Sequence, residues 1–436
     1  MSYLAIGISL FVGLAFWYME RNIYNPGTLM GFLWTLICVL AKMRAYELYA
    51  ASDYTYLLIS IALAMFGLGC LVARNMRTKF SSGIHLHLLY KSEEATFNYT
   101  IIRILCVLSV IIMADNAIDN AKDLMSGIEM SDIRARDTAT SFSHPIFYLL
   151  NNYIVRPFSF AILPMFAVDF LLSKHRDTVI TLSTVIIILE RVLIEGGRVI
   201  IIYALTALFI TMAFSKGRIK IKKSTVFMIL GITVVACVAV YIISLSRGIE
   251  DGSDMLRSLY MYVCGCVPHL SIRLEHMARL ETYTFGFASM NGIVHYVLTL
   301  FENVGMDYPD FFALVRELIN VEDKVYISGD LQQFNAFVSP IYYMYIDGGI
   351  AGVAIGMFLY GFFSHHLYKK TKNNLNPRNL TVYLLIAQGL LTTMVRMQFS
   401  QVYYTVAFFF ICFLINKPLP KRQETLESTC EIKNKE

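Results

Sequence analysis

The stretch TVITLSTVIIILERVLIEGGRVIIIYALTALFITMAF, residues 178–214, contains two strongly apolar runs joined by a turn that carries Glu195, two glycines and Arg198. A helix needs about 20 predominantly apolar residues to span a membrane. Each run approaches that length, so the stretch predicts two spanning helices with a tight turn between them. What Glu195 and Arg198 do at this turn depends on the side of the membrane that it faces.

The composition of the whole chain fits the same class. Of its 436 residues, 56% are hydrophobic and only 16% are charged, and the mean hydropathy is +0.56. Soluble domains carry about 25% charged residues. The expected fold class is therefore all-α, a polytopic integral membrane protein with about 11 transmembrane helices, within a range of about 10–12. The apolar runs are 3–19, 27–43, 55–73, 100–114, 145–172, 178–194, 199–214, 224–245, 337–366, 380–395 and 401–415.

The chain divides into one transmembrane domain and a tail. Residues 1–415 hold all the apolar runs and include one long connection, 246–336. Residues 416–436 are polar and charged, which favours a disordered tail. Residues 3–19 lack a basic start and a small-residue cleavage site, so they predict a first span rather than a removable signal peptide.

Lysine and arginine are distributed unevenly between the connections. Short cytoplasmic loops carry an excess of these residues. One set of alternate connections, counted with the tail, holds 21 Lys and Arg, whereas the other set holds 7 when the long connection is left out. The first set, which includes 215–223 and 367–379, is therefore assigned to the cytoplasm. The connection 246–336 and the N-terminus then lie outside, so 246–336 is a long external loop.

Metal and nucleic-acid sites are not expected. The nine histidines never fall into ligand spacing with the eight cysteines or with carboxylates. Cys264 and Cys266 are the only close pair of thiols, and simple packing explains them. We therefore expect no metal and no cofactor. No basic patch with interleaved aromatics indicates a nucleic-acid partner.

Several arginines lie where a membrane protein disfavours them. Arg156 is inside the apolar run FYLLNNYIVRPFSFAILPMF, and an arginine at the centre of a spanning helix costs roughly 2.5–3.5 kcal/mol. Guanidinium groups match phosphate oxygens in a bidentate fork, so the external arginines could converge on an anionic group. Each could equally be a snorkelling anchor, and Arg191 could simply pair with Glu195 four residues on. The other external arginines are Arg134, Arg136, Arg198, Arg247, Arg257 and Arg396.

Two further stretches are irregular. In NAFVSPIYYMYIDGGIAGVAIGMFLYGFF, residues 335–363, Pro340 and the Gly348-Gly349 pair disfavour a continuous helix. A short external or re-entrant helix joined to a true span is expected, with Asp347 either capping the span or standing at the lip of a cavity. Glycines 349, 352 and 356 favour close helix packing. The apolar part of 288–305 is too short to span, which predicts an interfacial or buried helix.

These features together resemble the O-antigen polymerase (Wzy-type) family of bacterial polysaccharide polymerases. The matches follow in span order over nearly the whole chain, and the most specific is NAFVSPIYYMYIDGGIAGV, residues 335–353. The shorter matches are Asn25-Pro26 followed by Trp34, MSDIRARD with Arg134, EGGR with Arg198 and SRG with Arg247.

The resemblance implies an enzyme of the bacterial inner membrane whose active site faces the periplasm, which makes 246–336 a long periplasmic loop. Such an oligosaccharide repeat unit polymerase transfers a growing glycan from undecaprenyl diphosphate to the non-reducing end of a new undecaprenyl-diphosphate-linked unit, in the synthesis of O-antigen or a related surface polysaccharide. Arginines would stabilise the lipid-diphosphate leaving group without a metal. Inner membrane lipids, a chain-length regulator protein and a flippase are the other expected partners.

The expected catalytic residues are Arg198, Arg247 and Asp347. The acceptor hydroxyl needs a general base within hydrogen-bond reach, and Glu195, His269, Asp330 and Asp347 are all open for that role. The expected substrate-binding residues are Arg134, Arg136, Arg156, Glu195, Arg257, His269, Asp330, Asn335, Tyr342 and Arg396.

Two other functions share part of this pattern. A ligase-type transferase of lipid-linked glycans would use the same charges with a different acceptor. A flippase for lipid-linked oligosaccharides would tend to show two corresponding halves with interrupted helices at the midplane. Here the irregular stretches and the charges gather at one surface, which favours the polymerase.

Overall fold

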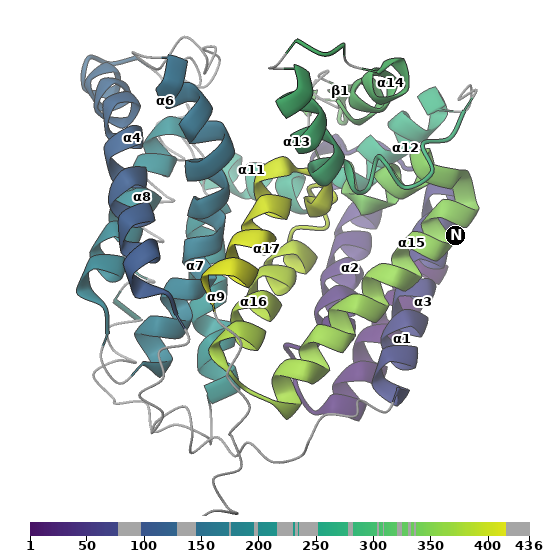
Figure 1. Cartoon of the computed structure of the whole chain (residues 1–436). Coiled ribbons are helices and arrows are strands. Elements are labelled where there is room, and N and C mark those ends of the chain that lie inside the picture. The colour runs from purple at the N-terminus through teal and green to yellow at the C-terminus, as the bar shows by residue number, and fades with distance from the viewer. Residues whose placement is uncertain are drawn as a thin grey trace, which may run out of the picture.

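The computed structural model describes residues 1–76, 97–128, 145–173, 176–195, 199–215, 230–231, 234, 252–277, 282–302, 305–307, 309–320, 325–329, 333–334 and 337–415. They form a bundle of helices with one two-stranded antiparallel pairing (Figure 1). The helices along the bundle are α1 (Ser2–Glu20), α2 (Pro26–Met43), α3 (Asp53–Asn75), α4 (Tyr99–Met125), α6 (Pro145–Leu150), η3 (Asn151–Val155, a π-helix), α7 (Arg156–Leu172), α8 (Thr178–Glu195), α9 (Val199–Ser215), α15 (Ser339–Asn373), α16 (Pro377–Leu391) and α17 (Val402–Leu414). The elements of the connections are η1 (Ala45–Glu47), α11 (Gly252–Cys264), α12 (Cys266–His276), α13 (Asn291–Glu302), α14 (Asp310–Ile319), β1 (Val325–Tyr326), β2 (Gln333–Phe334) and η5 (Gln398–Ser400).

The predicted all-α membrane fold is confirmed. Among the described residues, six helical segments are long and apolar enough to cross a membrane: α1, α2, α3, α4, α15 and the continuous segment Ile146–Leu172. α9 and α17 are apolar but shorter. The number of eleven spans stays a prediction, and the expected span 224–245 lies almost wholly outside the described residues.

α4 is longer than its apolar run. Hydropathy predicts an end near residue 114, but the helix continues to Met125, so this boundary is wrong. Asn116 and Asn120 lie in the extension and are buried. Asn120 donates a hydrogen bond to the carbonyl of Leu193 on α8 at 3.2 Å. Contacts with α8 therefore stabilise the polar end of α4, which hydropathy alone assigns to a loop.

Two hydrophobic cores hold the bundle together. One joins α4, α7, α8 and α9 with α16 and α17, and the other joins α1, α2 and α3 with α11, α12 and α15 (Figure 1). At the α3–α15 crossing the backbones touch, because Gly69 lies against the carbonyl of Phe358 and Gly361 lies against the carbonyl of Phe66. A Cβ atom would stand 2.0 Å from the carbonyl oxygen at Gly69 and 2.1 Å at Gly361. Glycine is thus required at both positions for this approach.

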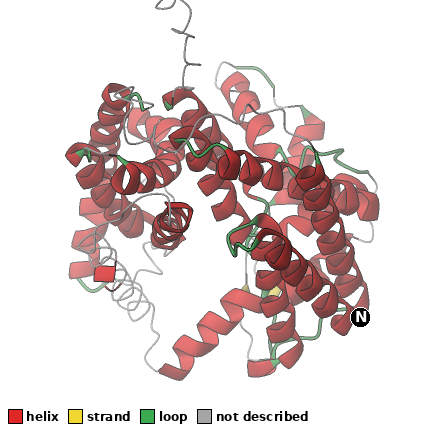
Figure 2. Ribbon diagram, turned by 90° about the horizontal axis from the view of Figure 1, so that it is seen from below, coloured by secondary structure: helices red, strands yellow, loops and turns green. Residues whose placement is uncertain are grey.

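The connections divide between two ends of the bundle. One end, which we call the loop face, carries α11 to α14 and the N-terminus, whose amine lies 3.3 Å from Asp53 Oδ1 (Figure 1). The opposite end, which we call the Glu20 face, joins the ends of α1, α3 and α15. Figure 2 looks onto the Glu20 face and shows most helices end-on.

Near the Glu20 face, the start of α4 pairs with the end of α17. Phe97 forms an antiparallel bridge with Ile415, and the amide of Asn98 donates to the carbonyl of Leu414 at 2.9 Å. These bonds satisfy backbone groups at two helix termini, where partners within the helix are missing.

The predicted break in α15 is confirmed. Gly349 has φ 61°, in the left-handed region, and the segment Ser339–Asp347 folds back along the rest of the helix. Met344 consequently lies against Gly352 and Gly356. A Cβ atom at Gly352 would be 2.3 Å from the Met344 carbonyl oxygen. The glycine spacing therefore serves close packing, as expected, and the packing partner is the chain's own preceding helical segment.

Candidate functional site

α7 and α8 bring three charged side chains together toward the loop face. Arg156 is the first residue of α7, and Arg191 and Glu195 are one turn apart at the end of α8. Arg156 Nη2 lies 3.3 Å from Glu195 Oε1, and Arg191 donates to the same oxygen. The side chain of Arg191 is only 1% exposed, whereas those of Arg156 and Glu195 are 40% and 33% exposed. One carboxylate therefore holds two guanidinium groups, with an excess of positive charge.

Tyr403 of α17 completes this group. Its ring centroid lies 4.6 Å from the guanidinium carbon of Arg156, within the range of a cation–π interaction. The ring stacks on Phe160 at 4.7 Å between centroids, which fixes its orientation. Arg191 is close enough for the Tyr403 phenol to interact with its charge. We call Arg156, Arg191, Glu195 and Tyr403 the arginine cluster.

The arginine cluster contains two N–H donors without hydrogen-bond partners in the described part of the chain. Nε of Arg156 and Nε of Arg191 are buried and have no hydrogen-bond partner among the described residues. A buried donor without a partner costs about 1–3 kcal/mol. An anion with several oxygens would satisfy both donors and balance the excess charge, so the arrangement suits a phosphate-type ligand.

Arg396 lies nearby, in the connection between α16 and α17. Its charge is close enough to act on the phenols of Tyr203 and Tyr343. Tyr203 belongs to α9, and its carbonyl accepts a hydrogen bond from Gln388 of α16 at 3.0 Å. Arg396 thus adds a further cation where α9, α15 and α16 meet.

Asp347 serves the fold of the loop face. Its carboxylate, which is 8% exposed, accepts hydrogen bonds from the Thr284 hydroxyl at 2.6 Å and from the amides of Ala288 and Ser289 at 2.9 and 3.0 Å. It therefore caps the segment 284–290 and does not cap its own span. Both oxygens are engaged, which disfavours Asp347 as a proton acceptor.

His269 and Tyr342 are also tied into the fold. Burial, with Arg273 next to the ring, lowers the pKa of His269 to about 4, so the ring is neutral at neutral pH. Its Nδ1 then donates to the Phe337 carbonyl at 3.2 Å, and its Nε2 accepts from Arg273 at 3.1 Å. The Tyr342 hydroxyl donates to the Leu318 carbonyl at 3.0 Å. Both residues position helices of the loop face.

The remaining expected site residues are placed as follows. Arg257 lies in α11 on the loop face. The residues outside the described part of the chain are Arg134, Arg136, Arg198, Arg247, Asp330 and Asn335. The structure therefore brings together Arg156 and Glu195 from the expected set, with Arg396 nearby.

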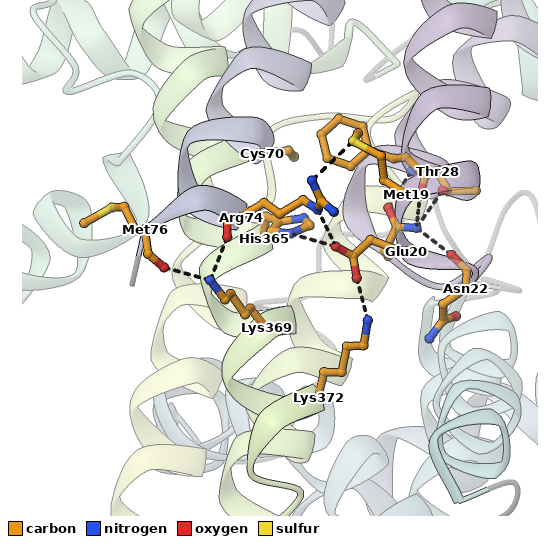
Figure 3. Close-up of polar contacts among 12 residues, drawn as sticks. Met19, Glu20, Asn22, Thr28, Cys70, Arg74, Met76, His365, Lys369 and Lys372 are labelled. Carbon is orange, nitrogen blue, oxygen red and sulfur yellow. Dashed lines mark hydrogen bonds and ion pairs between the residues drawn. The ribbon is translucent and has the colours of Figure 1, made fainter. Parts of the chain in front are cut away.

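A second charged group lies on the Glu20 face, and its role is structural (Figure 3). The Glu20 carboxylate accepts from Arg74 Nε at 3.0 Å and from Lys372 Nζ at 2.6 Å. Lys369 donates to the carbonyls of Arg74 and Met76 at the end of α3, at 2.7 Å each. Figure 3 shows Arg74 of α3 and Lys372 of α15 converging on Glu20 at the end of α1, and Lys369 reaching the end of α3. Charge is paired here, whereas the arginine cluster keeps unpaired donors.

Arg191 and Tyr403 are functional candidates that the sequence analysis missed. Arg191, like Arg156, stands inside an apolar run, and this signal could have selected it. Its spacing to Glu195 indicates an ion pair within one helix. This ion pair is present, and Glu195 also contacts Arg156. No sequence signal distinguishes Tyr403 from the other tyrosines.

The geometry of the arginine cluster suits recognition of an anion near the loop-face end of the bundle. Two guanidinium groups share one carboxylate, and an aromatic ring orders one of them. Among the described residues, no group of three or more histidine, cysteine or acidic side chains could hold a metal ion. No protein-family model, no curated protein and no solved structure matches this chain.

Proposed function

We propose that this chain is a glycosyltransferase that polymerises undecaprenyl-diphosphate-linked oligosaccharide repeat units. It would act at the periplasmic face of the bacterial inner membrane, in the synthesis of O-antigen or a related surface polysaccharide. The observation that carries the proposal is the arginine cluster, with two guanidinium groups on Glu195 and two buried donors without partners. A lipid-linked diphosphate is an anion that such a group can bind bidentately.

The reaction needs charge stabilisation more than covalent chemistry. The bond between the glycan's anomeric carbon and the donor diphosphate breaks, and the diphosphate leaves with the electron pair. The acceptor hydroxyl forms the new bond to that carbon and gives its proton to a base. Arg156 and Arg191 would stabilise the negative charge on the leaving diphosphate. Of the four expected bases, Asp347 and His269 are engaged in the fold, so Glu195 and Asp330 remain. Glu195 would have to act through Oε2, because both arginines contact Oε1.

The test of the proposal is the glycan ladder of cells that lack this chain. A polymerase predicts that long chains disappear while a single repeat unit remains attached to lipid A core. Loss of all repeat units would instead indicate the ligase-type transferase or the flippase. A ladder of normal length would contradict all three functions.

The proposed orientation places the Glu20 face in the cytoplasm and the loop face in the periplasm, with eleven spans. The excess of Lys and Arg in the connections of the Glu20 face supports it. A reporter fused after Lys223 is expected to be cytoplasmic, and one fused near Asp310 is expected to be periplasmic. Compartment-specific reporter activity measures both. Cytoplasmic activity of the Asp310 fusion would reverse the orientation and remove the loop face as the site.

Polymerisation in isolated membranes is expected to survive a strong chelator. The physical reason is that arginines supply the positive charge that a divalent ion would otherwise supply to the diphosphate. The measurement is chain length after incubation with and without chelator. Complete loss of elongation, restored by one divalent ion, would argue against the arginine mechanism.

A further inference from the structure

Three buried polar side chains outside the arginine cluster belong to α4, η3 and α8, and both η3 and α8 pack against α4. Asn116 of α4, Asn151 of η3 and Glu190 of α8 are 2%, 6% and 7% exposed. One polar atom of each side chain has no hydrogen-bond partner among the described residues: Asn116 Nδ2, Asn151 Oδ1 and Glu190 Oε2. Native proteins rarely leave such atoms unsatisfied, so three in one region indicate a ligand.

Two contacts set the register between α4 and α8. Near the Glu20 face, Arg103 of α4 donates to Asp177, just before α8, at 2.8 Å. Nearer the loop face, Asn120 of α4 donates to the Leu193 carbonyl of α8 at 3.2 Å. The offset in residue number is nearly the same at both contacts, so the two helices run in the same direction and rise together at about 1.5 Å per residue.

This register brings Asn116 level with Glu190. Asn116 is one turn before Asn120, so both side chains lie on the side of α4 that meets α8. Glu190 is three residues before Leu193 on α8, and its burial directs it inward. The two side chains therefore face the same space between the helices.

Asn151 of η3, which continues into α7, lies at the same level along the bundle as Asn116 and Glu190. Tyr99 at the start of α4 donates to Asp169 of α7 at 2.8 Å, and these two helices run in opposite directions. Asn151 precedes Asp169 by nearly the same number of residues as separate Tyr99 from Asn116. Asn151 also begins the π-helix η3, which packs against α4. Single π-helical turns inside α-helices occur frequently at functional sites.

The unsatisfied atoms define the chemistry of the ligand. Asn116 Nδ2 is a donor, whereas Asn151 Oδ1 and Glu190 Oε2 are acceptors when the carboxyl is ionised. A metal cation would meet the N–H of Asn116, which disfavours it. Water accepts and donates at once, and buried water typically makes about three hydrogen bonds. A buried carboxylate without a cation partner is costly and takes up a proton instead.

We propose that Asn116, Asn151 and Glu190 form a buried site that binds one water molecule and one exchangeable proton. The water accepts from Asn116 Nδ2 and donates to Asn151 Oδ1. The proton comes from bulk water and bonds to Glu190 Oε2, which then donates to the bound water. Release of the proton reverses this last bond, and the water donates to the carboxylate. The site does not depend on the proposed transferase activity.

Infrared spectroscopy of the purified full-length protein tests the site. The probes are the carbonyl stretching band of a protonated carboxylic acid and its shift in heavy water. The wild-type spectrum minus that of Glu190→Gln should show one such band at neutral pH, and the band should shift as soon as heavy water is added. Gln is nearly isosteric with protonated Glu, so the variant should keep its fold.

Two outcomes would overturn the proposal. One is the absence of a difference band, which would mean that Glu190 carries no proton. The other is a band that shifts only after the protein unfolds, which would mean that the site is dry. Asn116→Leu and Asn151→Leu should each slow the shift at least about tenfold, because they remove a partner of the water. Asp119→Asn is the matched control, because this α4 carboxylate is 62% exposed and pairs with Lys122. The infrared spectrum of this variant should show the same carboxylic acid band as the wild type.

Discussion

Replacement of Arg156 by alanine is expected to slow chain elongation about 10²–10³-fold, the usual cost of removing one preorganised donor from a site that stabilises negative charge. Arg156 is 40% exposed, so the change should leave the protein folded and at normal abundance in the membrane. Glu195 would keep Arg191 as its partner. The measurement is glycan chain length by gel, normalised to the amount of protein in the membrane.

The substitution Arg156→Lys distinguishes binding of the diphosphate from simple anchoring of the helix at the membrane interface. It keeps the charge and can still reach the interface, but it lacks the planar fork and the Nε donor of arginine. Elongation by Arg156→Lys should therefore be clearly impaired. Lys122→Ala is the control, since Lys122 is 70% exposed and forms a surface ion pair with Asp119; its ladder should be normal. A normal ladder from Arg156→Ala at equal abundance would remove Arg156 from the site.

The second large effect concerns stability. Gly69→Leu is expected to lower the free energy of unfolding by about 1–3 kcal/mol or more, because a larger side chain must push two helix backbones apart. A Cβ atom at this position would already stand 2.0 Å from the Phe358 carbonyl oxygen. The measurement is the apparent melting temperature of the purified protein in detergent. Gly361→Leu, on the other side of the same crossing, should have a similar effect.

Gly7→Leu is the matched control for the helix crossing. Gly7 lies in α1, another apolar helix, and a Cβ atom there would meet nothing within 4 Å. The substitution should leave the melting temperature nearly unchanged. Equal destabilisation by Gly7→Leu and Gly69→Leu would show that the added side chain acts through a general effect on membrane insertion rather than through the α3–α15 contact.

The sequence predicts the parts of the fold that depend on local composition. Apolar runs mark the helices, and the Gly348-Gly349 pair marks the break in α15, because both signals lie within one helix length. The end of α4 is different, since residues 115–125 are polar and look like a loop. Their helix depends on contacts with α8, such as that of Asn120, which local composition cannot report.

The candidate site could be predicted only in part. Arg156 stands out because an arginine inside an apolar run is costly and requires a partner. Which partner it finds depends on how α7, α8 and α17 pack, and that packing brings Glu195 and Tyr403 from distant positions in the chain. Asp347 shows that the sequence can also suggest a site residue that the fold has already engaged. A carboxylate beside two glycines looks accessible in the sequence, yet the segment 284–290 folds onto it and uses both oxygens.

The pairing of Asn98 with Leu414 has a consequence for biosynthesis. The core that contains α4, α7, α8 and α9 also contains α16 and α17, which are synthesised later. A chain emerging from the ribosome can pack α1 against α2 early, but more than three hundred residues separate Asn98, at the start of α4, from its partner Leu414. During that interval the buried faces of α7 and α9 lack their final partners and must be covered by lipid or by an insertion chaperone. Quality control of this protein should therefore respond to the integrity of α17, which supplies the partner of α4 and packs against α7.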